Sequence, residues 1–281
     1  MAQDAFADNN EEQEKLSYPI LNPAERRAER GSLCALAVMA KAPRAGKVKT
    51  RLSPPLTLEE SAALNICFLR DTTRNIADVV ADGSAAGLIC YTPVGDEGAF
   101  DGLLPDGFAL IPQRGDTFGE RLLAAAEDIL ACGYGAVCLI DSDSPTLPTN
   151  ALQQAVEELA RPGDRVVLGG SDDGGYYLIG LKQAHAAPFE RITWSTGSVY
   201  AETVERVCEA KVALVEMPLW YDVDDAATLA VLETELLDGK RPGFARIDGY
   251  KAEFTREYLA KRRQANQADE FSPSSAVRGT R

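Results

Sequence analysis

The chain has 281 residues, 45% of them hydrophobic, and carries a formal net charge of −14 at pH 7. Its length suits one α/β domain with irregular ends. The acidic balance argues against a nucleic-acid polymer or an anionic membrane as partner, because both require a basic protein face. No run of about 18 apolar residues occurs, so we expect no membrane span.

The cysteine and histidine content argues against further kinds of catalytic and metal site. The six cysteines form no Cys-x-x-Cys pair and most lie in apolar runs, which is typical of free thiols in a reducing, cytoplasmic compartment. The single histidine, His185, makes a zinc site or a Ser-His-Asp group a poor interpretation. Residues 1–31 lack the apolar core of a secretory signal. We expect flexible tails over 1–31 and 262–281, flanking one domain over 32–261.

Seven short apolar runs alternate with segments of helical periodicity. The runs that we expect to be strands are Leu33–Met39, Gly87–Tyr91, Phe108–Ile111, Ala136–Ile140, Arg165–Leu168, Tyr176–Leu181 and Val212–Met217. This alternation predicts right-handed crossovers and a three-layer α/β/α fold around a mainly parallel, mixed sheet. In such a sheet, ligands bind beyond the carboxyl ends of the strands.

Helix start signals lie between the runs. Thr57 with Glu60, and Thr117 with Glu120, each fit a capping box. The second predicted helix carries one apolar face, formed by Phe118, Leu122, Ala126 and Ile129. A further helix is expected within residues 238–261.

The segment after the first predicted strand is basic. Five cations fall within the eleven residues from Lys41 to Arg51. The spacing fits neither the P-loop nor the dinucleotide glycine pattern. Gly46 permits close approach of a phosphate, and Lys41, Lys49 and Arg51 supply charge and hydrogen-bond donors. We expect phosphate binding here, and a solvated charged loop is the alternative.

Two carboxylates, Asp141 and Asp143, follow the fourth predicted strand. Paired carboxylates at the end of a buried strand are costly unless a cation compensates them. Hard oxygen ligands beside phosphates are what Mg²⁺ or Mn²⁺ prefers. Asp222, in the segment before the last helix of the core, could complete the metal site. Asp224 is equally well explained as the N-cap of that helix.

A glycine-rich segment joins the fifth and sixth predicted strands. It contains Asp172, Asp173, Gly174 and Gly175, and it fits either a simple hairpin or a loop that binds an acceptor or sugar. Three weaker candidates lie elsewhere in the chain. Gln113 and Asp116 follow the third strand and could contact a nucleotide, although structural capping explains them equally well. Trp194 could form an aromatic wall for a sugar, although an aromatic residue near a loop more often belongs to the core.

Four ordered motifs over about Leu33 to Leu237 resemble those of a bacterial glycosyltransferase-like family, that of arsenosugar biosynthesis, in the GT-A nucleotide-diphospho-sugar transferase superfamily. The motifs are Lys41–Leu52, Gly115–Arg121, Asp141–Pro145 and Asp173–Leu181, and Trp194-Ser195-Thr196 also fits. The layout is also similar to guanylyltransferases of molybdenum-cofactor and phospholactate metabolism. Their late motif reads Asp-Ile-Asp-Thr-Pro-Glu, whereas Asp222–Ala227 here lacks the Thr-Pro.

The resemblance implies a metal-dependent glycosyltransferase with a nucleoside diphosphate sugar donor and a small-molecule acceptor. Asp141 and Asp143 would hold the metal, Lys49 and Arg51 would stabilise the leaving diphosphate, and Asp173 would orient or deprotonate the acceptor. Two alternatives stay open. One is a nucleotidyltransferase that joins a nucleoside triphosphate to a phosphorylated small molecule, and the other is a silent nucleotide-sugar binder. The oligomeric state is also open, a homodimer included.

Overall fold

The computed structural model describes residues 18–270 and contains one seven-stranded sheet, in the order β3-β2-β1-β4-β6-β5-β7. The strands are β1 Cys34–Lys41, β2 Ala85–Thr92, β3 Ala109–Pro112, β4 Ala136–Ile140, β5 Arg165–Ser171, β6 Tyr176–Leu181 and β7 Ala213–Trp220. Only β6 runs antiparallel to its neighbours in this described sheet. All seven predicted strands are therefore present, and the mainly parallel, mixed sheet is confirmed.

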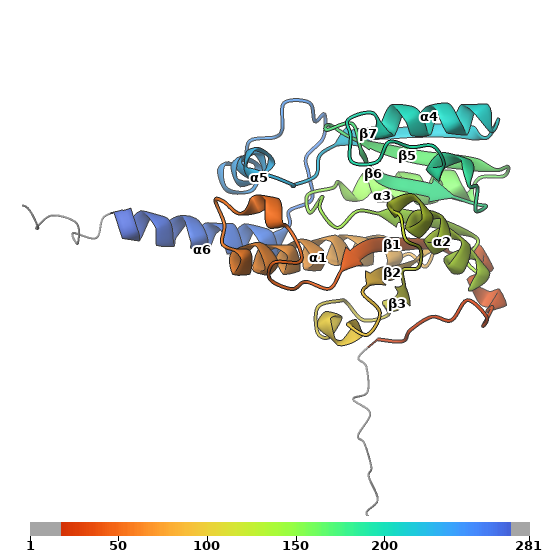
Figure 1. The fold of residues 1–281 in the computed structure, drawn as a ribbon, viewed down its shortest axis with the longest axis horizontal. Helices are drawn as coiled ribbons and strands as arrows, with labels where there is room; N and C mark the ends of the chain where they lie inside the picture. Colours follow the sequence, from red (N-terminus) through yellow and green to blue (C-terminus); the bar gives the residue numbers. More distant parts are fainter. Residues whose placement is uncertain (1–17, 271–281) are drawn as a thin grey trace, which may run out of the picture.

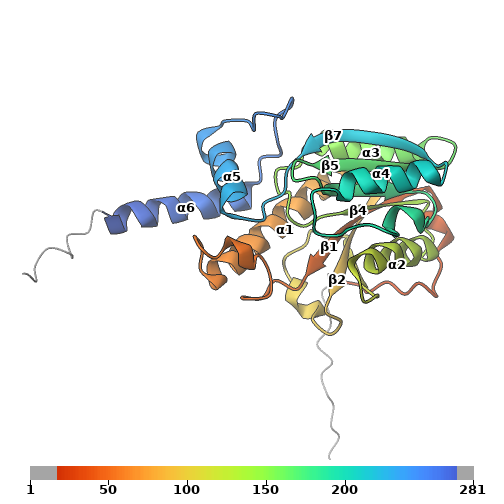
Figure 2. The ribbon, with the colours of Figure 1, turned by 45° about the horizontal axis from the view of Figure 1, so that its top comes forward.

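Helices cover both faces of the sheet (Figures 1 and 2). They are α1 Leu58–Val80, α2 Phe118–Ala131, α3 Thr149–Ala160, α4 Val199–Glu209, α5 Ala226–Asp238 and α6 Glu253–Glu270. Short 3-10 turns lie at Ala28–Ser32, Thr50–Leu52, Glu97–Phe100 and Ala187–Phe189. Helices α1, α3, α5 and α6 pack on one face and α2 and α4 on the other, which confirms the three-layer fold.

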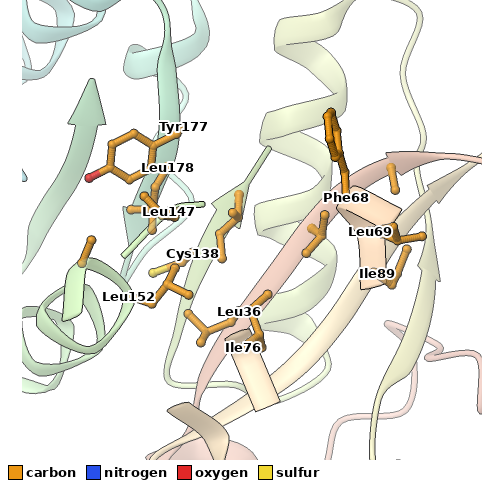
Figure 3. Close-up of a cluster of buried hydrophobic side chains, with 14 of the residues drawn as sticks. Leu36, Phe68, Leu69, Ile76, Ile89, Cys138, Leu147, Leu152, Tyr177 and Leu178 are labelled. Atoms are coloured by element: carbon orange, nitrogen blue, oxygen red, sulfur yellow. The ribbon is translucent and has the colours of Figure 1, made fainter. Parts of the chain in front are cut away.

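Two apolar clusters, one on each face, hold the layers together. Successive side chains of a strand point to opposite faces, so Leu36 and Val38 enter one cluster while Ala35 and Ala37 enter the other. Figure 3 shows part of the first cluster, where Leu36 of β1 lies near Ile76 of α1. Since both faces of β1 are buried, its near-continuous apolar run is the expected sequence.

Both predicted capping boxes are formed, at Thr57 with Glu60 and at Thr117 with Glu120. The expected apolar face of α2 needs one correction. Ile129 is fully buried, but Phe118 remains 48% exposed. Phe118 is the first residue of α2, and its ring packs against Trp194 beside an open hollow instead of within the core.

The ends of the domain differ from the predicted boundaries. Residues 18–31 were expected to be a flexible tail, yet Leu21 is 8% exposed and its backbone N–H donates to the Leu110 carbonyl at 2.7 Å. The isolated bridge between Ile20 and Leu110 extends the β3 edge. At the other end, α6 continues to Glu270, so 262–270 is helical. The remaining tail positions, 1–17 and 271–281, lie outside the described residues. Within residues 18–270, no helix combines the length and apolar character needed to cross a membrane.

Helix α6 runs beside α1 and is anchored at its N-terminus by a side chain from that helix (Figures 1 and 2). The residue before α6 is Ala252, which has no side-chain acceptor for the first N–H groups. Asp71 of α1 supplies one, accepting from the N–H groups of Phe254 at 3.1 Å and Thr255 at 2.7 Å. Asp71 is 1% exposed, and burial raises its pKa while these hydrogen bonds oppose the rise. A residue 183 positions away therefore caps α6.

We predict that Asp71→Ala lowers the free energy of unfolding by about 2 kcal/mol, because it removes two hydrogen bonds to a carboxylate and the cap of α6. Urea denaturation monitored by circular dichroism measures the change. Asp78→Ala, which alters an exposed carboxylate of the same helix, is the matched control. Equal stability of the two variants would contradict the capping role.

Candidate active site

Three chain segments bring carboxylates together beyond one edge of the sheet. They are the end of β4, the β5–β6 turn and the segment after β7. Five of these carboxylates line one hollow there: Asp141, Asp143, Asp173, Asp222 and Asp224. Backbone hydrogen bonds tie the segments together: the Val223 N–H donates to the Asp143 carbonyl at 2.9 Å, and the Asp141 N–H donates to the Tyr177 carbonyl at 3.0 Å. The structure thus brings the three predicted metal residues and Asp173, one of the predicted acceptor residues, to one place.

Two adjoining hollows meet at these carboxylates. The first, here called the aromatic hollow, has a volume of about 420 Å³, and its lining includes Phe118, Tyr176, Trp194, Leu122 and Val199. The second, the basic hollow, has a volume of about 340 Å³, and its lining includes Lys41, Lys47, Lys49, Arg51, Asn65 and Ser142. The walls shared by both are Met39, Arg51, Phe118, Asp143 and Asp224. A ligand that fills both hollows would pass over the carboxylates.

Lys49 occupies the centre of the junction. Its side chain is 5% exposed, and its Nζ lies 2.9 Å from Asp143 Oδ2, 2.9 Å from Asp224 Oδ1 and 2.7 Å from the Val223 carbonyl. Burial alone would lower the pKa of Lys49, but Asp143 and Asp224 outweigh burial and raise it. An ammonium has three donors, and all three are used here. Direct phosphate binding by Lys49 stays a prediction, and it requires one of these contacts to break.

Asp141 is less well compensated than Asp143. Burial raises its pKa well above the usual value, and the neighbouring charges of Asp143 and Asp222 raise it further. The Ser144 hydroxyl, which donates to Asp141 Oδ2 at 2.8 Å, and the more distant Lys49 oppose this only in part. Asp141 is therefore a carboxylate that would gain from a nearby cation.

Asp222 is in a similar position on the opposite segment. Burial, followed by the charges of Asp173, Asp224 and Asp143, raises its pKa to about 7. Asp224 differs because it pairs with Lys49 and lies 3.5 Å from the Arg51 guanidinium. It is not the helix N-cap that the sequence suggested: Asp225 caps α5 by accepting from the N–H groups of Ala227 and Thr228, both at 2.9 Å.

The glycine-rich segment is a hairpin turn that also faces the aromatic hollow. Gly174 has φ +90°, and a Cβ there would come within 2.1 Å of the Gly197 carbonyl oxygen. Only glycine permits this close approach of the loop before α4. The turn places Asp173, which accepts from the Gly175 N–H at 2.7 Å, in the lining of the hollow. The hairpin interpretation is therefore confirmed, and acceptor or sugar binding by this segment stays a prediction.

Three rings form the aromatic wall. Trp194 packs edge to face against Phe118 at 5.0 Å and against Tyr176 at 6.4 Å, measured between ring centroids. Gly119 makes room for the indole, since a Cβ there would lie 2.9 Å from Trp194 Nε1. Sequence reasoning identified Trp194 but assigned Phe118 to the core. Its position two residues after Asp116, at the start of a helix that follows a strand end, was the available signal.

Five predicted residues lie outside the linings of these two hollows: Gly46, Gln113, Asp116, Asp172 and Gly174. The Gln113 amide donates to the Cys90 carbonyl at 2.7 Å, which closes the end of the sheet. The backbone N–H of Asp116 donates to Glu120 within the start of α2. Asp172 is exposed beside the turn, and its N–H donates to the Trp220 carbonyl at 3.0 Å. Ligand contact by these residues stays a prediction.

The donor set suits a divalent cation that is shared with phosphate. Among residues 18–270, no three His, Cys, Asp or Glu side chains converge tightly enough to hold an ion by themselves. Mg²⁺ usually binds one or two protein carboxylates together with substrate phosphates and water, so a complete protein cage is not required. Asp141 and Asp222, whose pKa values are raised first by burial and then by neighbouring negative charge, are two carboxylates of the site that form no ion pair with the described residues. The residues therefore fit such an ion once a phosphate ligand is present.

We predict that Lys49→Met destabilises the fold by about 2 to 3 kcal/mol, because it leaves Asp143 and Asp224 repelling each other, with partial relief from solvent. Adding Asp224→Asn in the same chain should recover part of the loss. Lys47→Met, in the same loop but exposed, serves as the control. Guanidinium denaturation of the four proteins measures the coupling, and a double variant no more stable than Lys49→Met alone would argue against it.

Comparison with known proteins agrees with this architecture. A family model described as an uncharacterized protein conserved in bacteria (DUF2064) matches residues 75–196. A crystal structure assigned to the nucleotide-diphospho-sugar transferases, from Desulfovibrio desulfuricans G20, shares 30% sequence identity, with a TM-score of 0.67 over 82% of this chain and 97% of its own. No curated protein matches.

Two more distant structures are too dissimilar to bear on activity. A 4-diphosphocytidyl-2C-methyl-D-erythritol synthase from Anaerococcus prevotii DSM 20548 has 13% identity and a TM-score of 0.46, over 74% of this chain and 97% of its own. Rv0371c from Mycobacterium tuberculosis H37Rv, in a complex with manganese, has 16% identity and a TM-score of 0.43, over 72% and 98%. The first structure is decisive, because its identity extends over nearly its whole length. The chain belongs to the nucleotide-diphospho-sugar transferase superfamily and is a transferase.

Proposed function

We propose that the protein is a metal-dependent glycosyltransferase that uses a nucleoside diphosphate sugar donor and a small-molecule acceptor. The observation that carries the proposal is the group of carboxylates at the junction of a basic hollow and an aromatic hollow. A nucleotide sugar has the same division, with an anionic diphosphate beside a neutral ring. The cytoplasmic location and the homodimer stay predictions.

The donor diphosphate would lie in the basic hollow. Lys41 and Lys47 line it without an ion pair to any of residues 18–270, and Arg51 reaches both hollows. These side chains supply charge-assisted donors to phosphate oxygens, which would stabilise charge as it develops on the leaving group. Lys49 would hold Asp143 and Asp224 in place rather than supply a free donor.

Asp141, Asp143 and Asp222 would hold the metal, Mg²⁺ or Mn²⁺. When bound, the ion would neutralise negative charge on the diphosphate leaving group. Asp143 and Asp222 come from different segments, so their approach depends on the hydrogen bond between Val223 and Asp143. The chain's own contribution is to keep these carboxylates close while Lys49 limits their repulsion.

The acceptor would enter the aromatic hollow. Asp173 lines it with a carboxylate that can accept a hydroxyl proton or orient the hydroxyl. Its neighbours Asp172, Gly174 and Gly175 form the rest of the turn. Trp194 offers an apolar ring of the kind on which a sugar face packs, and the hollow is large enough for a small molecule.

A second candidate is nucleotidyl transfer, which the basic hollow specifically favours. Lys41, Lys47 and Arg51 could neutralise a triphosphate as well as a diphosphate. The two reactions differ in the bond that breaks: glycosyl transfer releases a nucleoside diphosphate, whereas nucleotidyl transfer from a nucleoside triphosphate releases pyrophosphate.

We predict that the protein releases a nucleoside diphosphate from at least one nucleotide sugar when Mn²⁺ and a hydroxyl acceptor are present. Chromatography of a panel of nucleotide sugars identifies the product. A parallel panel of nucleoside triphosphates with sugar phosphates tests for pyrophosphate. Asp173→Asn should slow the reaction at least tenfold, since it removes the candidate base. Pyrophosphate release without any nucleoside diphosphate would replace the first candidate by the second.

We predict that Mn²⁺ and a nucleoside diphosphate together raise the melting temperature, because both bind the folded state. Asp141→Asn should abolish the part of the shift that depends on metal, since it removes an uncompensated carboxylate of the site. Asp106→Asn, an exposed position in the loop before β3, is the control. An undiminished metal effect in Asp141→Asn would remove Asp141 from the metal site.

A further inference from the structure

Helix α1 carries two buried asparagines with contrasting surroundings. Asn75 is 1% exposed, and both ends of its amide are used. Its Nδ2 donates to the Leu147 carbonyl at 2.7 Å, and its Oδ1 accepts from the Thr149 hydroxyl at 2.6 Å. Asn75 therefore links α1 to the start of α3, and its role in the fold is complete.

Asn65 lies ten residues earlier on the same helix and is also buried, with 6% of its surface exposed. Its side-chain amide has no hydrogen-bond partner among residues 18–270, and it lines the basic hollow. The amide atoms of Asn65 are not among the described side-chain nitrogen and oxygen atoms that are sealed from solvent without a partner, so they face the open hollow. Asn65 thus contributes no side-chain hydrogen bond to the described fold, a leucine would lose none, and packing alone does not explain an asparagine there.

The charges around Asn65 indicate what it would bind. Lys41 and Lys47 have no ion-pair partner among the described residues, while Asp143 and Asp224 are held by Lys49. The hollow therefore presents unused cations, and its acidic groups are already paired. An anion with several oxygen acceptors suits it better than a neutral ring, because the ring would leave the lysines uncompensated.

We propose that Asn65 is a ligand-binding residue whose Nδ2 donates a hydrogen bond to a phosphoryl oxygen in the basic hollow. The inference deepens the proposed function and rests on it. A neutral amide adds a directed donor to the less directional attraction of the lysines, so it would select the position of the phosphoryl group. A phosphoryl oxygen of the bound ligand would then be the hydrogen-bond partner that the Asn65 amide lacks among the described residues.

The test is isothermal titration of the full chain with inorganic pyrophosphate in the absence of metal. Asn65→Leu should weaken binding about tenfold or more, the effect of losing one hydrogen bond to a charged group. Asn65→Asp, which keeps the shape but adds a negative charge, should weaken it further. The melting temperature of Asn65→Leu should equal or exceed that of the unaltered protein.

Asn75→Leu is the matched control, with a lower melting temperature and unchanged pyrophosphate affinity when measured below that temperature. Separate titrations with a nucleoside diphosphate and with a hexose 1-phosphate show whether the phosphoryl group belongs to donor or acceptor, and a loss with either supports the proposal. Unaltered pyrophosphate affinity in Asn65→Leu and Asn65→Asp would overturn it, as would failure of the unaltered protein to bind pyrophosphate. If nucleotide sugars were still turned over, the proposed function would survive that result.

Discussion

The contact of the Lys49 ammonium with Asp143, Asp224 and the Val223 carbonyl is the interaction on which the site depends. It joins the loop after β1, the end of β4 and the segment before α5. Lys49 reaches this position from a left-handed backbone conformation, φ 49°, which is unfavourable for a residue with a Cβ. The two acidic groups would otherwise repel each other across a partly buried junction. One lysine thus allows two carboxylate-bearing segments to approach closely. The two carboxylates that it joins, Asp143 and Asp224, line both hollows.

This arrangement divides the carboxylates into two kinds. Asp143 and Asp224 are paired with a cation of the protein, while Asp141 and Asp222 are raised in pKa by burial and by neighbouring negative charge. The paired carboxylates stabilise the junction. The carboxylates without an ion pair would be stabilised by a bound cation. The Asn65 amide, which forms no hydrogen bond with the described residues, would likewise be stabilised by a bound ligand, in its case one that accepts a hydrogen bond. Groups that lower stability in this way are common in binding sites.

The sequence predicted much of the fold because its signals are local. Alternation of apolar runs and helical segments located all seven strands, and the capping boxes at Thr57 and Thr117 located two helix starts. The predictions failed where a distant partner decides the outcome. Phe118 fits the helical periodicity, but its ring packs beside the distant Trp194 and remains 48% exposed. Residues 18–31 lack strong local signals, yet the β3 edge pairs with them through Leu110.

The sequence by itself determined the fold class, the acidic pair after β4 and the basic loop after β1, since each rests on residues close together in the chain. Only the tertiary structure decided how these groups are used. Lys49 was predicted to bind phosphate, but its donors are taken by Asp143, by Asp224 and by the Val223 carbonyl, which is 174 positions away. In the sequence, nothing distinguishes Asn65 from other polar residues of a helix. In the structure, it lines the basic hollow and has no hydrogen-bond partner among the described residues. Whether a polar group is paired or free depends on which segments meet, and long-range packing rather than local sequence sets that outcome.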